Sequence, residues 1–347
     1  MKEVYIDDMC YRLPGGLSPF QVGMYTHLIN WKWSHITKDP GEHLYRGRPI
    51  PYDAILPDRY RKQEQLPHVY EPVTEHLLRH RRNNPFRIHK HFYHMASSQV
   101  ANLNLFLPIL HSPQVNLILG SLKPDFKELA KDHLDQGYCI EYWGDNYQPG
   151  GKGPLGDKSA IAGTDADIAI AYRNYDGQLC LWLVEHKLTE PEFTTCGGFR
   201  SRGRKEQHDC AKAFSAILHD KSTCYYHDVR KFKYWDITAS HHTFFRNHSE
   251  YEQCPFQGGM NQLWRNQLLA LSIENDDAYP FEQACFSVVR HPKNDSLVPT
   301  IEEFRELTAG NKHFFSFTSS DVLACAEAHA DPKLSKWIEW YKELYNV

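Results

Sequence analysis

The sequence predicts an α/β protein with a central mixed β-sheet flanked by helices, preceded by an irregular N-terminal extension. Two apolar runs of strand length, 167–172 and 179–184, are separated by a short polar turn. Segments with helical spacing of apolar residues, 95–106 and 262–275, stand before and after them. With 347 residues, 41% apolar and 24% charged, the chain is long enough to bury a large core.

The extension is assigned to residues 1–66 and the main domain to 67–347. A helix is expected to begin at Ser18, which can cap it, with Pro19 at its first position. The rest of the extension is expected to be irregular because prolines recur in it. They are Pro40, Pro49, Pro51 and Pro57, and Pro67 follows directly after the extension.

The segment 79–94 is basic, with four arginines, one lysine, four histidines and no acidic residue. Aromatic residues alternate with these charges, a composition that suits contact with phosphates as well as an ordinary solvated face. The next segment, 95–106, predicts a helix capped by Ser97 or Ser98, with Gln99 in its first turn. A short strand is expected at 139–143, which contains Glu141.

The centre of the chain is a predicted β-hairpin. Its turn is Asn174–Gly177, in which Asp-Gly accepts the positive φ that a tight hairpin needs. If 174–178 form the loop, Arg173 pairs with Leu179. Both runs are apolar on both faces, so the strands are expected to be covered on both sides.

Counting outward from this turn places Asp167 opposite Glu185 and Asp165 opposite Lys187. Cross-strand partners have Cβ atoms about 4.5–5.5 Å apart, close enough for two carboxylates to share one cation. Glu185 and Lys187 share a face because side chains alternate along a strand. Charges in an apolar setting are costly unless they are paired or bind a metal. The pattern therefore fits a Mg²⁺ site, and a salt-bridged strand end is the alternative.

These residues resemble the PD-(D/E)XK nuclease superfamily, specifically its restriction-endonuclease-like members. Asp167 followed by Glu185-x-Lys187 is similar to the superfamily core, and 185–190 resembles the longer E-x-K-Y-T-E version. Leu188 departs from it, as does the absence of a proline before the first acidic residue. Three further stretches are similar to the same group: 97–106, 141–142 and 262–266.

The resemblance implies a restriction-endonuclease-like core and Mg²⁺- or Mn²⁺-dependent hydrolysis of DNA. Asp167 and Glu185 would hold the metal, with the carbonyl of His186 as a further ligand. Lys187 would position the attacking water and stabilise the transition state. Glu141 would supply a third carboxylate, and Gln262 would border the site.

The segment 196–205 is a second basic loop, whose arginines and Lys205 suit phosphate contacts. DNA is therefore the expected partner, although the net charge of −4 gives no global basic signature. No signal peptide and no apolar run of about 20 residues is visible, so a cytoplasmic protein without a membrane span is expected. The oligomeric state is not predicted.

The chain has nine cysteines, an odd number typical of reduced thiols. Four of them raise the alternative of bound zinc or an iron–sulfur cluster. They are Cys196, Cys210, Cys224 and Cys254. Since no two have the close C-x₂-C spacing of such sites, we interpret them as scattered reduced thiols.

In 262–275, leucines and Trp264 form the apolar side of the predicted helix, and Gln262, Arg265 and Asn266 form its polar edge. This edge is expected to bind phosphate or to hold Glu185 in place. The alternative is a polar stripe on the protein surface. A strand is expected at 284–290.

Helices are expected in the C-terminal part. One would be capped by Thr300 and ended by Gly310. The other would start at Asp331-Pro332 and bury a stripe that includes Trp337. Two other classes of function remain open: a nucleic-acid-binding module with a silent nuclease fold, and a protein built around a cysteine-ligated metal.

Overall fold

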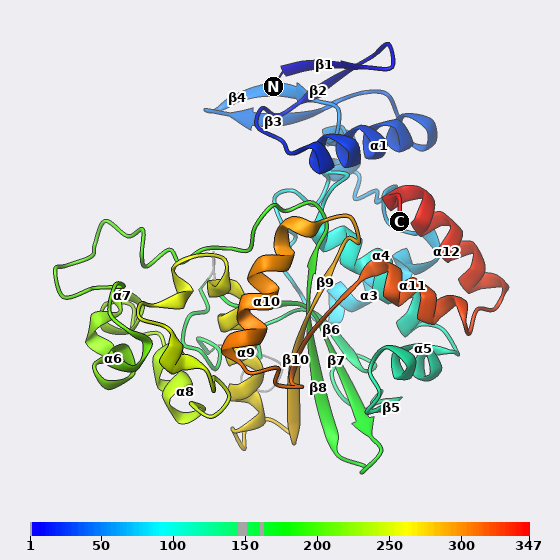
Figure 1. Ribbon diagram of the computed structural model, residues 1–347. Helices are drawn as coiled ribbons and strands as arrows, with labels where there is room; N and C mark the ends of the chain where they lie inside the picture. The colour runs from blue at the N-terminus through cyan, green and yellow to red at the C-terminus, as the bar shows by residue number, and fades with distance from the viewer. Residues whose placement is uncertain (1, 145–150, 160–162) are drawn as a thin grey trace.

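The computed structural model describes residues 2–144, 151–159 and 163–347. Its centre is a six-stranded mixed sheet, which confirms the predicted α/β fold (Figure 1). Along the sheet the order is β10-β9-β8-β7-β5, and β6 also pairs with β7. The strands are β5 (Phe126–Leu129), β6 (Tyr138–Tyr142), β7 (Ala166–Asn174), β8 (Leu179–Lys187), β9 (Gln283–Arg290) and β10 (Phe314–Thr318).

Strands β7 and β8 form the predicted hairpin. Their antiparallel register runs from Arg173 opposite Leu179 to Ile168 opposite Val184, as counted from the turn. Strands β8, β9 and β10 are parallel to one another, whereas β5 and β6 are antiparallel to β7. Strand β8 is buried along its whole length, which confirms that the hairpin is covered on both sides.

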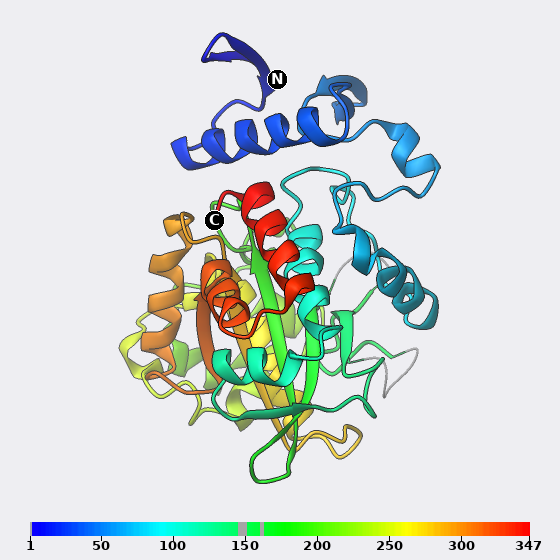
Figure 2. The same ribbon diagram turned by 90° about the vertical axis from the view of Figure 1, so that its right-hand side faces the viewer.

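Helices cover the two faces of the sheet (Figures 1 and 2). One face carries α4 (Ser98–Leu110), α5 (Val115–Leu122), α11 (Ser319–Glu327) and α12 (Pro332–Tyr345). The other face carries α8 (Tyr234–Ser240), α9 (Met260–Glu274) and α10 (Val298–Leu307). Because side chains alternate, Trp182 and Val184 pack toward α4, and Leu181 and Leu183 pack toward α9.

The N-terminal extension is not irregular, which corrects the expectation from its prolines. It consists of two β-hairpins and a long helix around a small core of their own. The elements are β1 (Lys2–Ile6), β2 (Met9–Leu13), α1 (Pro19–His35), β3 (Gly41–Tyr45) and β4 (Arg48–Tyr52). Ser18 caps α1 as predicted.

Turn residues and proline positions explain why the extension is regular. Asp7 and Asp8 both have positive φ, as do Arg46 and Gly47, so each hairpin closes with the backbone conformation that a two-residue turn requires. Pro49 and Pro51 lie two positions apart in a two-stranded sheet. The backbone N–H positions that these prolines lack therefore both lie on the same edge of β4. Strand pairing tolerates a missing N–H at an open edge.

The extension packs against the rest of the chain rather than standing apart. The Gln21 Nε2 atom donates to the carbonyl of Thr189, just after β8, at 3.0 Å. His27 contacts the carbonyl of Glu343 at 2.8 Å, so α1 lies beside α12 (Figure 2). Two short helices, α2 (Asp58–Lys62) and α3 (Thr74–Asn83), and a 3₁₀ turn (Glu71–Val73) lead on to α4. The division at residue 66 stays a prediction.

The C-terminal region contains a strand that the sequence did not predict, β10. The helix expected to be capped by Thr300 begins earlier, at Val298, and Leu297 stands at the cap position without a side-chain bond. That expected capping box is wrong. The last helix begins after Asp331 as predicted, and Asp331 accepts hydrogen bonds from the first-turn backbone.

A long insertion joins β8 to α9 and has little regular structure. Between 188 and 213 it contains neither helix nor strand, and short helices follow, α6 (Phe214–His219), α7 (Tyr225–Asp228) and α8. Three 3₁₀ turns complete it: Lys221–Thr223, His248–Glu250 and Pro255–Gln257; another, Asp295–Leu297, precedes α10. No helix in the described part of the chain is long and apolar enough to cross a membrane.

Candidate active site

Three residues predicted for the site meet where β7 begins and β8 ends. Glu185 and Lys187 lie on the α9 face of β8, and the Lys187 Nζ atom is 2.8 Å from Glu185 Oε1. The Asp167 Oδ2 atom accepts a hydrogen bond from the backbone N–H of His186 at 2.6 Å. Glu185 and Lys187 are buried, so their opposite charges are largely shielded from water.

Helix α9 fixes the carboxylate of Glu185 from the other side. Gln262 Nε2 donates to Glu185 Oε1 at 2.7 Å, and Asn266 Nδ2 donates to Oε2 at 3.0 Å. Gln262 and Asn266 are four residues apart, so they lie on one side of the helix and both reach the same group. The sequence placed both residues on this edge but selected only Gln262 as a site residue. Asn266 is the residue that was missed.

Arg265, on the same predicted edge, belongs to a different network. Its Nη1 atom donates to Thr164 Oγ1 at 3.3 Å, and Thr164 donates to Asp157 Oδ2 at 2.5 Å. Tyr234 donates to the same Asp157 oxygen at 2.7 Å. This buried network fixes the chain directly before Asp165.

Glu141 reaches the same cluster through a local distortion of β6. Its neighbours pair regularly with β7, but Glu141 itself has a φ of 51° and does not appear in the ladder. A non-glycine residue with this φ is uncommon, and such distortions often redirect a side chain. The Gln99 Nε2 atom, from the first turn of α4, donates to Glu141 Oε1 at 2.7 Å.

The acidic groups of the cluster are crowded. Burial raises the pKa of Glu141 and of Asp167 well above the usual range, and the neighbouring carboxylates raise it further. Burial raises the pKa of Asp165 to about 6, and the carboxyls of Glu141 and Asp165 are close enough to affect each other's pKa. Asp165, which the sequence placed opposite Lys187, is therefore part of the cluster.

Comparison of the sequence with models of known protein families identifies the family to which the chain belongs. The family model described as "Restriction Endonuclease associating with ARP" matches residues 34–346. The chain belongs to this restriction endonuclease family. The match includes every site residue described above. No curated protein and no solved structure matches the chain.

Lys187 is placed to remain a cation. Burial alone would lower its pKa, but the carboxylates of Glu185, Glu190 and Asp167 outweigh burial and raise it. An ammonium group that keeps its proton is an electrostatic partner and hydrogen-bond donor rather than a base.

The side chain of His186 takes no part in the cluster. It points to the opposite face of β8, where burial lowers its pKa to about 3 and both ring nitrogens are buried without a hydrogen-bond partner. Only the backbone of His186 faces the site. Its N–H binds Asp167, and the suggestion that its carbonyl is a metal ligand stays a prediction.

The donor set suits a hard divalent cation, since it consists of carboxylates that repel one another. Burial, together with the neighbouring carboxylates, raises the pKa of Glu141, Asp165 and Asp167, and Lys187 supplies a positive charge beside Asp167 and Glu185. No three His, Cys, Asp or Glu side chains within the described residues are grouped closely enough to hold an ion as they stand. Glu185 instead binds Lys187, Gln262 and Asn266 (above).

The basic segment 79–94 borders this cluster. Gln99 Oε1 accepts from the backbone N–H of His89 at 3.0 Å, and Gln99 Nε2 also donates to the carbonyl of Arg87 at 3.0 Å. Burial lowers the pKa of His89, and the charges of Glu190 and Lys187 are near enough to affect it. One glutamine thus joins the basic segment to the acidic cluster.

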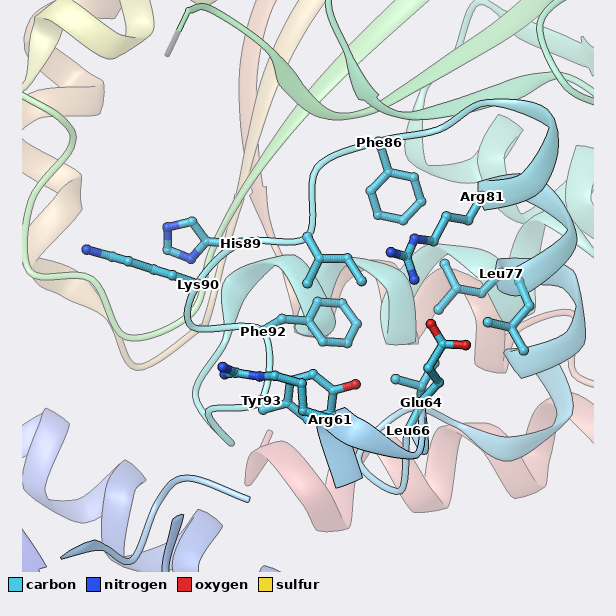
Figure 3. A pocket seen from close by; sticks show the side chains of 12 residues that line it. Arg61, Glu64, Leu66, Leu77, Arg81, Phe86, His89, Lys90, Phe92 and Tyr93 are labelled. Carbon is cyan, nitrogen blue, oxygen red and sulfur yellow. The ribbon is translucent and has the colours of Figure 1, made fainter. Parts of the chain in front are cut away.

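The same segment forms one wall of a cavity of about 320 Å³ (Figure 3). Its floor is apolar, with Phe86, Phe92 and Leu77 among the residues that line it. Figure 3 shows Arg81 and Glu64 directed into the cavity from α3 and from the turn that follows α2. The second basic loop, including Arg200 to Lys205, lines a shallow surface hollow on the insertion.

The interpretation of four cysteines as scattered is wrong. Cys196, Cys210, Cys224 and Cys254 line one small cavity in the insertion. Their reduced state is as predicted, since all nine cysteines of the chain are free thiols.

Proposed function

We propose that this chain is a divalent-metal-dependent endonuclease of the PD-(D/E)XK type that hydrolyses phosphodiester bonds of DNA. The observation that carries the proposal is the arrangement around Glu185. Its buried carboxylate contacts Lys187 on the same strand face, with Asp167 on the neighbouring strand and two amide donors from α9. Membership of a restriction endonuclease family supports the same reaction class.

Asp167 and Glu185 are the proposed metal ligands, with Mg²⁺ or Mn²⁺ as the ion. A cation bound there would lower the pKa of a water molecule and offset the charge that develops on the phosphate. Glu141 is the proposed third carboxylate, directed toward Asp167 by Gln99. Gln262 and Asn266 would orient Glu185, as the hydrogen-bonded partners of metal ligands do in other proteins.

Lys187 is proposed to act by charge and position. Because its raised pKa keeps it protonated, its ammonium group donates hydrogen bonds to the attacking water and to a phosphate oxygen. A fixed positive charge in a site with little water stabilises developing negative charge more strongly than it would in solution.

DNA is the proposed substrate because basic surfaces stand on both sides of the cluster in the chain. One is 79–94, which Gln99 links to Glu141. The other is the loop 200–205, which follows β8. Cation-rich surfaces of this kind bind the phosphate backbone without reading sequence.

The proposal is tested by incubating the full chain with supercoiled plasmid and with single-stranded DNA, each with Mg²⁺, Mn²⁺ or EDTA. Nicking is expected with either metal and not with EDTA, and Lys187→Ala and Asp167→Ala should both lack it. Lys342→Ala, which removes an exposed lysine on α12 paired with Glu327, is the control that should cleave normally.

Full activity in EDTA, or in either site variant, would overturn the proposal. DNA binding without cleavage under all conditions would also count against it and favour a nucleic-acid-binding module. In that case the charged cluster would be a remnant of a nuclease fold.

A further inference from the structure

The insertion between β8 and α9 brings together four thiols that are far apart in the chain. Cys196 and Cys210 lie in the irregular part, Cys224 directly precedes α7, and Cys254 precedes the last 3₁₀ turn before α9. All four line the same cavity. Each is partly buried and none is in a disulfide.

Hydrogen bonds hold the segments that carry three of these cysteines, Cys196, Cys210 and Cys254, against one another. The N–H of Cys254 donates to the carbonyl of Cys210 at 3.1 Å. The N–H of Cys196 donates to the carbonyl of Gln257 at 3.1 Å, and Gln257 Nε2 donates back to the carbonyl of Cys210 at 2.7 Å. Their proximity is therefore a consequence of specific pairing.

Three of the sulfur atoms also face backbone donors in the turn that follows. Cys196 Sγ accepts from the N–H of Phe199 at 3.3 Å. The sulfur of Cys224 interacts with the N–H groups of Tyr226 and His227, and that of Cys254 with the N–H of Phe256. The donors thus come two or three residues after the cysteine.

Burial raises the pKa of these thiols, and the backbone donors oppose that rise because they favour the anionic form of sulfur. A neutral thiol is a weak acceptor, whereas thiolates bound to a metal are commonly surrounded by hydrogen bonds to sulfur. Two arginines lie near the group: Arg204 near Cys210 and Cys224, and Arg265 near Cys196.

We propose that Cys196, Cys210, Cys224 and Cys254 bind one structural Zn²⁺ ion. Four thiolates are a common closed ligand set for zinc, with no position left for a substrate. The cavity volume of about 20 Å³ has room for about one water-sized particle, which fits a single ion rather than a multi-iron cluster.

As they stand, the thiols surround the cavity without meeting at one point. No group of three potential ligands in the described segments is close enough to hold an ion. Binding therefore requires cysteine side chains to turn inward, and a zinc ion would replace the thiol protons as it binds.

The position of the site explains what the ion would do. The longest irregular part of the insertion lies between β8 and α6. A bound metal commonly stabilises small units that have little hydrophobic core of their own. The basic loop 200–205 lies between Cys196 and Cys210. Trp264 of α9 lines the same cavity. Zinc would thus fix the basic loop against the helix that holds Glu185.

The test is the metal content of the full chain, purified without chelator and measured by elemental analysis. About one zinc per chain is expected. Cobalt added to the metal-free protein should give the intense thiolate-to-metal absorption of a tetrahedral sulfur site. Cys210→Ser and Cys254→Ser should lose most of the bound zinc. Cys325→Ser, a partly buried thiol on α11, is the matched control that should retain it.

If the serine variants do not fold, the wild-type chain still decides the question. Absence of zinc together with no cobalt absorption would overturn the proposal. So would iron with inorganic sulfide in place of zinc, or unchanged zinc in folded Cys210→Ser. None of these measurements depends on DNA cleavage, so they are independent of the proposed function.

Discussion

Glu185 and Lys187 stand two residues apart on one face of β8, and their charged atoms are 2.8 Å from each other in a buried setting. Opposite charges this close stabilise each other only while both are present. Removing either leaves the other charge buried without its partner. The site can therefore be tested by stability as well as by activity.

Lys187→Met should reduce DNA cleavage by at least about 100-fold, because it removes a positive charge from the site. It should also lower the free energy of unfolding by about 3 kcal/mol, since Glu185 would remain buried without its cation. Urea unfolding followed by fluorescence measures the second effect. Lys187→Arg, which retains the charge, should lose less stability; equal losses in the two variants would contradict the argument.

Asp167→Asn should abolish cleavage and yet stabilise the metal-free protein at pH 8. Burial and the charge of Glu185 raise the pKa of Asp167, so its ionised form is unfavourable in the folded state. Each unit of pKa shift corresponds to about 1.4 kcal/mol. An increase of a few degrees in Tm is expected in EDTA. The exposed Asp277→Asn should leave Tm unchanged, and a lower Tm for Asp167→Asn would show that the carboxylate is not repelled.

The pH dependence of the metal-free protein follows from the same groups. Because the pKa values of Glu141 and Asp167 are raised on folding, the unfolded chain releases these protons at lower pH than the folded chain. Below about pH 4 these groups are protonated in both the folded and the unfolded chain, so they do not lower the free energy of unfolding. As the pH rises toward the raised pKa values, the free energy of unfolding falls. Thermal unfolding in EDTA should show this fall between about pH 5 and pH 8, which lies above the normal pKa of a carboxyl group.

Mg²⁺ should oppose that fall, since a cation favours the ionised carboxylates. Stabilisation by Mg²⁺ is expected to grow with pH. A Tm that rises with pH in EDTA, or the same Mg²⁺ effect in Asp167→Asn, would contradict the assignment of these carboxylates to a metal.

Asn266→Ala should lower kcat by about 10- to 100-fold while the affinity for DNA stays unchanged, because Asn266 holds Glu185 and does not face solvent. Gln262→Ala should act similarly. Ser272→Ala lies on the same helix and removes a hydroxyl bonded only to its own helix carbonyl. It is the control. Steady-state cleavage kinetics with DNA-binding measurements separate kcat from binding.

Gln99→Met should raise the Mg²⁺ concentration needed for half-maximal cleavage by about tenfold, since Gln99 orients Glu141. It should also increase hydrogen exchange in 86–91, because the contacts with Arg87 and His89 are lost. Gln114→Met, a partly buried glutamine next to α5, is the control. Unchanged exchange in 86–91 would show that Gln99 does not support the basic segment.

Much of the site could be predicted because it is local in sequence. A tight turn fixes which residues of β7 and β8 are opposite, and strand alternation fixes the shared face of Glu185 and Lys187. Helical spacing placed Gln262 and Asn266 on one edge of α9. Two partners were possible for that edge, a phosphate or Glu185. Helical spacing alone could not decide between them.

Non-local features escaped prediction. Strand β10 is a short aromatic run that becomes a strand by pairing in parallel with β9. Glu141 enters the cluster only because β6 is distorted at that residue and α4 supplies Gln99 from 42 positions away. Local propensity contains no information about either contact.

The sequence by itself predicted the fold class through its resemblance to a known superfamily, and it determined the hairpin register and the meeting of Asp167, Glu185 and Lys187 through turn chemistry and a period of two. Only the tertiary structure decided that Asn266 holds Glu185 and that four distant cysteines line one cavity. Those arrangements depend on how separate elements pack and on which buried polar groups must find partners, and both are properties of the whole folded chain.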